Sequence, residues 1–192
     1  SLLLQVASQK IKDWGAVVLK ADGLAGGKGV FLCHNKKDLE EASRTLQENK
    51  YQSATKKILL EKFLYGRECS YFSLIGKAHS IEPLGFAVDF KRREEEDRGP
   101  NTGGMGAYSP VPWLPEDAEF QVQSKIIKPL LREFSLRKIE YNGFLYCGIM
   151  WTQKGPFVLE FNVRLGDPEA QVLAVADSRD WLALIMASLG KK

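Results

Sequence analysis

The sequence predicts an α+β protein in which antiparallel sheets are covered by helices. Two observations carry this prediction. Short runs of β-branched and apolar residues occur in pairs around glycine-containing turns, which is typical of hairpins. Longer stretches with apolar residues at helical spacing lie between these pairs. Strands joined mainly by hairpins favour antiparallel sheets over a doubly wound parallel sheet.

The first part of the chain predicts a helix, a hairpin, a second helix and a strand. Residues 2–14 form the helix, and residues 16–20 and 30–34 form the hairpin around a glycine-rich loop. Residues 36–49 carry Leu39, Ala42 and Leu46 on one helical face. Residues 57–64 form the strand.

The second part predicts two further hairpins and two further helices. One hairpin joins residues 68–75 and 78–86 at Gly76-Lys77, and the other joins 143–152 and 156–163 around Lys154-Gly155. Residues 89–108 form a long polar loop, which in a compact domain is usually functional or disordered. The helices span residues 115–139, divided near Pro129, and 169–189.

Composition is that of a soluble globular protein, with 192 residues, 44% hydrophobic and 27% charged. The net charge of +3 gives no argument for nucleic acid or a membrane as a partner. Without a secretory signal or an 18-residue apolar run, we expect a cytoplasmic protein. The three cysteines have no metal-ligand spacing, so they are interpreted as buried thiols. A start at Ser1 inside a helix suggests a fragment.

Residues 20–29 form a glycine-rich segment suited to phosphate. Gly26 and Gly27 allow close approach of backbone N–H donors, and Lys20 and Lys28 supply positive charge. The order of residues is not that of a Walker loop, and a strand follows instead of a helix. The alternative is a flexible turn with solvated lysines.

Residues 61–64, Glu-Lys-Phe-Leu, end an apolar strand and are followed by Glu68. Adenine recognition needs one backbone donor and one backbone acceptor from an extended segment, here at Lys62 and Leu64. The carboxylates of Glu61 and Glu68 could then accept hydrogen bonds from ribose. The alternative is a solvated strand end.

Residues 89–106 join a charged run to a glycine-rich one. Asp89 and Lys91 precede the stretch Asn101-Thr102-Gly103-Gly104, whose backbone could wrap a small anion or carboxylate. The alternative is a solvated charge run, against which the glycines argue.

Glu160, Asn162 and Arg164 share one face of a predicted apolar strand because side chains alternate with period two. Carboxylate and amide oxygens suit Mg²⁺ that bridges phosphates, and an arginine beside the metal suits a phosphoryl oxygen. Burial of three polar groups on such a strand would otherwise be costly. The alternative is the polar outer face of an antiparallel strand.

In this order the four segments resemble the ATP-grasp superfamily. Two longer stretches, residues 99–110 (Gly-Pro-Asn-Thr-Gly-Gly-Met-Gly-Ala-Tyr-Ser-Pro) and 158–171, look like signatures of the phosphoribosylamine–glycine ligase family. The resemblance covers residues 17–171. It implies an ATP-grasp fold with two lobes of antiparallel sheet, packed helices and the nucleotide held between them. The smaller, nucleotide-clamping lobe would span about 15–75 and the larger about 76–192.

The resemblance implies an ADP-forming ligase of purine synthesis that joins glycine to 5-phosphoribosylamine, using ATP and Mg²⁺ or Mn²⁺. The implied roles are catalytic for Arg164 and Lys28; nucleotide binding for Lys20, Gly26, Gly27, Lys28, Glu61, Lys62, Leu64 and Glu68; substrate binding for Asp89, Lys91, Asn101, Thr102, Gly103, Gly104, Arg164, Asp167 and Pro168; and metal binding for Glu160 and Asn162.

Departures from the family pattern keep two alternatives open. The family usually has His at Phe90 and Gln at Val88, and it carries flanking N- and C-terminal domains, which would be partners of this segment. Another ATP-grasp carboxylate–amine ligase is disfavoured by the loop at 99–106. A nucleotide-binding module without catalysis is disfavoured by Glu160, Asn162 and Arg164.

Overall fold

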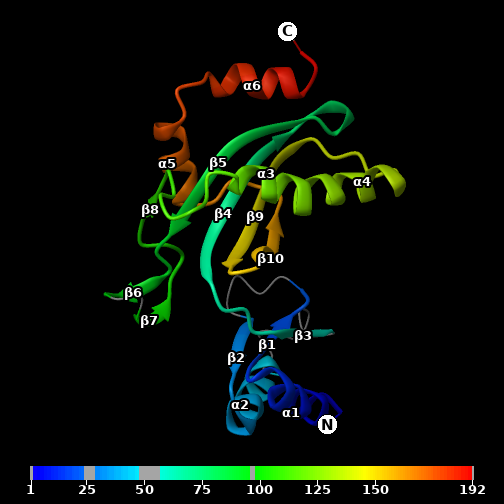
Figure 1. Ribbon diagram of the computed structural model, residues 1–192, viewed down its shortest axis with the longest axis vertical. Helices are drawn as coiled ribbons and strands as arrows, with labels where there is room; N and C mark the ends of the chain where they lie inside the picture. Colours follow the sequence, from blue (N-terminus) through cyan, green and yellow to red (C-terminus); the bar gives the residue numbers. More distant parts are fainter. Residues whose placement is uncertain (1, 24–28, 48–56, 96–97, 192) are drawn as a thin grey trace. The chain divides into compact units, whose positions relative to one another are not determined.

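The computed structural model describes residues 2–23, 29–47, 57–95 and 98–191, with no description of the side chains at 92 and 98–101. It divides into two compact units, Ser1–Leu64 and Tyr65–Lys192 (Figure 1). Helices and antiparallel strands make up both units, which confirms the predicted α+β class.

The first unit is a three-stranded antiparallel sheet with two helices on one face. Its elements are α1 (Leu2–Trp14), β1 (Val17–Ala21), β2 (Val30–Cys33), α2 (Lys36–Leu46) and β3 (Ile58–Lys62). The strand order is β2-β1-β3, so the predicted hairpin of β1 and β2 is confirmed. Val17 and Leu19 of β1 pack against Leu39 and Leu46 of α2. Alternation along β1 therefore turns Val18 and Lys20 to the other face.

Helix α2 begins at a reciprocal cap. Asn35 accepts a hydrogen bond from the Asp38 N–H at 3.0 Å, and the Asp38 carboxylate accepts one from the His34 N–H at 2.8 Å. The bond from His34 is the main reason that the pKa of Asp38 is lowered. The cap fixes where β2 ends and the helix starts.

The second unit is built on a five-stranded antiparallel sheet of order β10-β9-β4-β5-β8. The strands are β4 (Arg67–Ile75), β5 (Ile81–Asp89), β8 (Ala107–Tyr108), β9 (Gly143–Thr152) and β10 (Gly155–Asn162). Both predicted hairpins are present, because β4 pairs with β5 and β9 pairs with β10. β4, placed in the smaller lobe by the sequence, pairs along its whole length with β9.

Helices cover both faces of this sheet (Figure 1). On one face, α3 (Ala118–Val122), a π-helical segment (Gln123–Ile127) and α4 (Lys128–Leu136) follow one another. They pack on a core that includes Tyr71 and Ile149. On the other face, α5 (Glu169–Ala176) packs on Phe72 and Tyr146 through Leu173. The helix divides before Pro129, which cannot donate the hydrogen bond that a regular α-helix needs there.

Three local predictions are corrected. The polar loop at 89–108 contains two short paired strands, β6 (Arg92–Glu94) and β7 (Arg98–Asn101), as well as β8. The turn between β4 and β5 is a 3-10 turn (Lys77–His79), longer than the predicted two residues. The helix expected at 169–189 is two helices, α5 and α6 (Trp181–Ser188).

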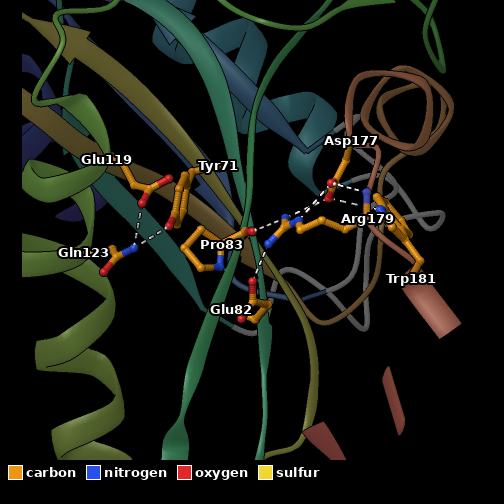
Figure 2. A network of polar contacts seen from close by, with 8 residues as sticks. All are labelled: Tyr71, Glu82, Pro83, Glu119, Gln123, Asp177, Arg179 and Trp181. Atoms are coloured by element: carbon orange, nitrogen blue, oxygen red, sulfur yellow. Dashed lines mark hydrogen bonds and ion pairs between the residues drawn. The ribbon is translucent and has the colours of Figure 1, made fainter. Parts of the chain in front are cut away.

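A guanidinium holds the segment between α5 and α6 (Figure 2). Arg179 donates to the Asp177 carboxylate at 2.7 and 2.8 Å and to the Pro83 carbonyl at 2.7 Å, and it pairs with Glu82. Asp180 then caps α6, because its side chain accepts from the Ala183 N–H. These contacts stop one helix and start the next.

Two further findings bear on the composition. Cys33, Cys69 and Cys147 are buried free thiols, as predicted. In the described part of the chain, no helix is long and apolar enough to cross a membrane.

Candidate functional site

The first unit carries a charge pair on the sheet face that its helices leave uncovered. Lys20 Nζ lies 2.7 Å from a Glu61 carboxylate oxygen. Lys20 has Val30 and Leu59 as its Cα partners on the neighbouring strands, and these side chains are 53% and 43% exposed. Exposed apolar side chains therefore flank the Lys20–Glu61 ion pair. Lys62 is exposed and Leu64 half-buried.

The predicted phosphate loop of this unit is only partly described. Gly26, Gly27 and Lys28 lie outside the described residues. The Ala21 N–H donates to the Gly29 carbonyl at 2.9 Å, so the hairpin ladder continues to the edge of the loop.

In the second unit, Glu160 and Asn162 lie on the sheet face on which α5 packs. Glu160 has Gly148 as its Cα partner on β9, and Asn162 has Tyr146. The Asn162 amide donates to Glu160 Oε1 at 3.1 Å, so the predicted common face of these two residues is confirmed. This bond leaves the Asn162 carbonyl oxygen as an acceptor.

The donor set of Glu160 and Asn162 fits a cation that also binds phosphate. One carboxylate and one amide oxygen suit Mg²⁺, which usually takes one or two protein carboxylates and completes its shell with substrate phosphates and water. No group of three or more acidic, histidine or cysteine side chains placed to hold a metal is found among the described residues. The pair fits a metal that arrives with a nucleotide better than one held by protein ligands alone.

Arg164 does not share the strand face of Glu160 and Asn162. β10 ends at Asn162 after a bulge between Val158 and Glu160, so period-two alternation stops before Arg164. The exposed Arg164 guanidinium donates to the Leu165 carbonyl at 2.9 Å. Glu160 is also exposed, so the expected cost of burial does not arise for Glu160 and Arg164.

Lys91 is held between two carboxylates at the neighbouring end of β4 and β5. Its ammonium lies 3.2 Å from Glu68 and 3.8 Å from Asp89. Burial disfavours the charged ammonium, but Glu68 and Asp89 outweigh this and raise the pKa of Lys91. Burial is the main reason that the pKa of Asp89 is raised; Lys91 lowers it in part, and Glu169 raises it further. Lys91 is therefore a fixed positive charge between two carboxylates.

The glycine-rich segment folds back onto this cluster. Thr102 donates through its hydroxyl to the Lys91 carbonyl at 2.9 Å and accepts from the Gly104 N–H at 3.1 Å. Gly104 has φ +122°, and a Cβ there would lie 2.6 Å from Pro168 Cδ and 3.2 Å from the Asp167 carbonyl oxygen. Only glycine fits this contact. The structure thus brings together two predicted segments, Thr102–Gly104 and Asp167–Pro168. Gly103 is exposed, and the Asn101 side chain is not described.

Sequence reasoning missed the polar groups beneath this cluster. The Tyr146 hydroxyl donates to Glu169 at 3.0 Å and accepts from the Ser70 hydroxyl at 2.9 Å. Gly148 also belongs to this site, because a Cβ there would lie 3.2 Å from Glu160 Cγ. The sequence marks Glu169 only as an acidic residue at the start of an apolar helix. Such a residue is equally well explained by a favourable interaction with the helix dipole.

The chain matches the family model described as the phosphoribosylglycinamide synthetase ATP-grasp (A) domain over residues 4–170. It is similar to a phosphoribosylamine–glycine ligase of Listeria innocua, with 42% identity over 92% of this chain and 42% of the relative. With a Vigna unguiculata ligase of the same name it shares 41% identity over 96% of this chain and 60% of that one.

Solved structures agree in fold. A Thermotoga maritima phosphoribosylamine–glycine ligase superposes with a TM-score of 0.83 and 33% identity, covering 98% of this chain and 48% of that one. A biotin carboxylase of Campylobacter jejuni, at 20% identity and a TM-score of 0.73, shares the fold alone. The chain spans about two fifths of the length of the Listeria innocua relative and three fifths of the Vigna unguiculata relative. With its antiparallel sheets and this match over most of its length, the chain belongs to the phosphoribosylglycinamide synthetase ATP-grasp (A) domain family.

Proposed function

We propose that this chain is the ATP-binding portion of a phosphoribosylamine–glycine ligase. The reaction joins glycine to 5-phosphoribosylamine through glycyl phosphate and yields glycinamide ribonucleotide, ADP and phosphate, an early step of purine synthesis. The observation that carries the proposal is the family match over residues 4–170, combined with the convergence of the candidate residues of the second unit on one sheet face. The parts of the longer relatives that this chain does not span would complete the enzyme.

The first unit would bind the nucleotide. Its exposed apolar face around Lys20 suits a flat base, and the Lys20 ammonium suits a phosphate oxygen. Lys62 and Leu64 would form hydrogen bonds with adenine through their backbone groups. Gly26, Gly27 and Lys28 would contact phosphates through N–H donors and one ammonium. The Glu61 carboxylate would accept a hydrogen bond from ribose, a role that we also propose for Glu68 on β4 of the second unit.

Glu160 and Asn162 would hold the divalent cation, Mg²⁺ or Mn²⁺. When bound, the cation would neutralise phosphate charge. Glu160 supplies one negative charge, and Asn162 supplies a neutral oxygen, so the site is not overfilled with negative charge. Arg164, beyond the strand end and exposed, would contact a phosphoryl oxygen with its guanidinium.

The segments Asp89–Lys91, Asn101–Gly104 and Asp167–Pro168 would bind glycine and the amine substrate. A carboxylate oxygen of glycine attacks the γ-phosphorus of ATP, and ADP leaves. The amine of phosphoribosylamine then attacks the carbonyl carbon, the amide bond forms, phosphate leaves and the amine loses a proton. Positioning and charge neutralisation supply most of the catalysis in such a transfer. Lys91, with its raised pKa, stays positively charged throughout.

The test uses the full-length protein with ATP, Mg²⁺, glycine and 5-phosphoribosylamine. We expect ADP release that requires both substrates, together with glycinamide ribonucleotide detected by mass spectrometry. Substituting Mn²⁺ for Mg²⁺ decides which cation serves better. ADP release that ignores glycine would contradict the assigned substrate. Nucleotide binding without any turnover would indicate a binding module.

A further inference from the structure

One buried hydroxyl joins three elements of the second unit. Tyr146 on β9 donates to Glu169 on α5, and Ser70 on β4 donates to Tyr146. Tyr146 is 6% exposed and Glu169 is 3% exposed. Burial is the main reason that the pKa of the Tyr146 phenol is raised, so the hydroxyl keeps its proton and acts as a donor. A buried carboxylate that lost this donor would be costly, which makes the bond a strong geometric constraint.

Glu169 also fixes the segment that precedes it. A Cβ added to Gly166 would collide with the Glu169 carboxylate, so the backbone at Gly166 lies directly against that group. The Ala170 N–H donates to the Gly166 carbonyl at 3.0 Å, which closes the turn into α5. The segment 163–168, which carries Arg164 and Asp167, therefore contacts the Glu169 side chain at Gly166.

The same segment supports the glycine-rich loop. Gly104 lies against Pro168 and the Asp167 carbonyl, and Thr102 links Gly104 to Lys91. A continuous set of contacts thus runs from Tyr146 through Glu169 and Pro168 to the loop.

We propose that Glu169 is a positioning residue, which holds segment 163–168 and the loop at 102–106 in the geometry that the carboxylate substrate requires, with Tyr146 as its essential hydrogen-bond donor. The proposal deepens the ligase assignment and rests on it for the identity of that substrate. Glu169 acts through Asp167, Pro168 and Thr102, because its buried carboxylate is turned to Tyr146 and Gly166. Glu169 thereby joins β9, the strand next to the proposed metal-binding strand β10, to the substrate loop.

The chain offers a matched control on the opposite face of the same sheet. Tyr71 on β4 is fully buried, and its hydroxyl accepts from the Gln123 amide at 3.1 Å (Figure 2). Tyr71→Phe and Tyr146→Phe each delete one buried phenol hydroxyl from the sheet. Tyr71 packs among the α3–α4 core residues, and its hydroxyl bonds Gln123 on that face instead of Glu169. A purely structural role for Tyr146 predicts equal effects of the two changes.

The experiment compares Tyr146→Phe, Glu169→Gln and Tyr71→Phe in the full-length protein. Amide hydrogen exchange of residues 102–106 and 163–168 is followed by mass spectrometry, and the KM for glycine and for ATP is measured. We expect Tyr146→Phe to speed exchange in both segments about tenfold and to raise the glycine KM about tenfold. The ATP KM should stay within about twofold. Glu169→Gln keeps an acceptor for Tyr146 and should give smaller changes, whereas Tyr71→Phe should lower the Tm without either effect.

Equal exchange in Tyr146→Phe and Tyr71→Phe would overturn the proposal, as would an unchanged glycine KM in a folded Tyr146→Phe. If Tyr146→Phe does not fold, Glu169→Gln decides, because the proposal requires a measurable increase of exchange there as well. If the unmodified protein forms no ADP with glycine, the ligase assignment fails, and hydrogen exchange alone then decides the positioning role.

Discussion

Gly148 and Glu160 are Cα partners on β9 and β10, and the Glu160 side chain passes directly over Gly148. A methyl group at position 148 would lie 3.2 Å from Glu160 Cγ, closer than ordinary van der Waals contact. The missing side chain at 148 therefore makes room for the carboxylate that we assign to the metal. A larger residue would displace that carboxylate by a few tenths of an ångström.

Gly148→Ala should therefore weaken the use of the cation and leave the fold intact. We expect the Mg²⁺ concentration for half-maximal ADP formation to rise about tenfold, since ligand placement sets metal affinity. The measurement is activity against Mg²⁺ concentration in the full-length protein, alongside the Tm. An unchanged Mg²⁺ dependence would mean that Glu160 does not ligate the metal or moves without cost.

Thr102→Val should impair the use of glycine. Valine keeps the shape of threonine but removes the hydrogen bonds to the Lys91 carbonyl and from the Gly104 N–H. We expect the glycine KM to rise about tenfold through misplacement of the loop, with ATP affinity nearly unchanged. Thr152→Val is a matched control, because Thr152 donates to the Gly155 carbonyl and accepts from the Lys154 N–H in the β9–β10 turn. Equal kinetic effects in both variants would contradict the assigned role of Thr102.

Arg179→Met should lower stability at neutral pH and flatten its acid dependence. The hydrogen bond from Arg179 is the main cause that lowers the pKa of Asp177 to about 2. A lowered folded-state pKa stabilises the protein above the unfolded value of about 4, and this contribution is lost as pH falls toward 2. We expect the free energy of unfolding at pH 7 to fall by about 1–2 kcal/mol, since Arg179 is partly exposed.

Urea unfolding of the wild type and of Arg179→Met between pH 7 and pH 3 checks this prediction. Arg137→Met is the control, because the Arg137–Glu133 pair is exposed on one helix and such pairs contribute about 0.3–0.5 kcal/mol. If Arg179→Met matches Arg137→Met in size and pH dependence, the Asp177–Arg179 contact does not hold the segment between α5 and α6.

The sequence predicts well those elements whose apolar pattern has a clear period. β9 runs from Gly143 to Thr152 as predicted, because apolar residues and a following turn define it. The pairing of β6 with β7 was not predicted because both strands are polar and β7 contains glycine. No alternation of apolar residues therefore marks them as strands. The placement of Arg164 on the face of Glu160 and Asn162 was wrong for a different reason: β10 ends at Asn162, one residue before the predicted end, so alternation does not reach Arg164.

The site is predictable only as far as its chemistry lies within short segments. Glu160 and Asn162 are two residues apart, so alternation alone places them together. The contact of Tyr146 with Glu169 joins residues 23 positions apart and depends on the packing of α5 on the sheet. In a single sequence, nothing indicates that a buried tyrosine and an acidic residue at a helix start are hydrogen-bonded to each other.

Glu160→Gln tests the central mechanistic assignment. The change keeps the shape of the side chain and its contact with Asn162 but removes one negative charge from the proposed cation site. Charge neutralisation carries most of the catalysis in phosphoryl transfer, so turnover in the full-length protein should fall about 100-fold. The affinity for ATP without Mg²⁺ should stay the same or improve, because a carboxylate that faces bare triphosphate repels it.

The measurement is turnover and ATP affinity, each with and without Mg²⁺, for the wild type, Glu160→Gln and Glu94→Gln. Glu94 on β6 is exposed and pairs only with its neighbour Arg93 in the described structure, so its neutralisation controls for a general change of surface charge. A metal ligand predicts a loss that requires Mg²⁺ and is confined to Glu160. A carboxylate that only repels the nucleotide predicts tighter binding in both conditions and normal turnover. Near-normal turnover in Glu160→Gln would therefore remove Glu160 from the metal site and leave Asn162 without a charged partner ligand on β10.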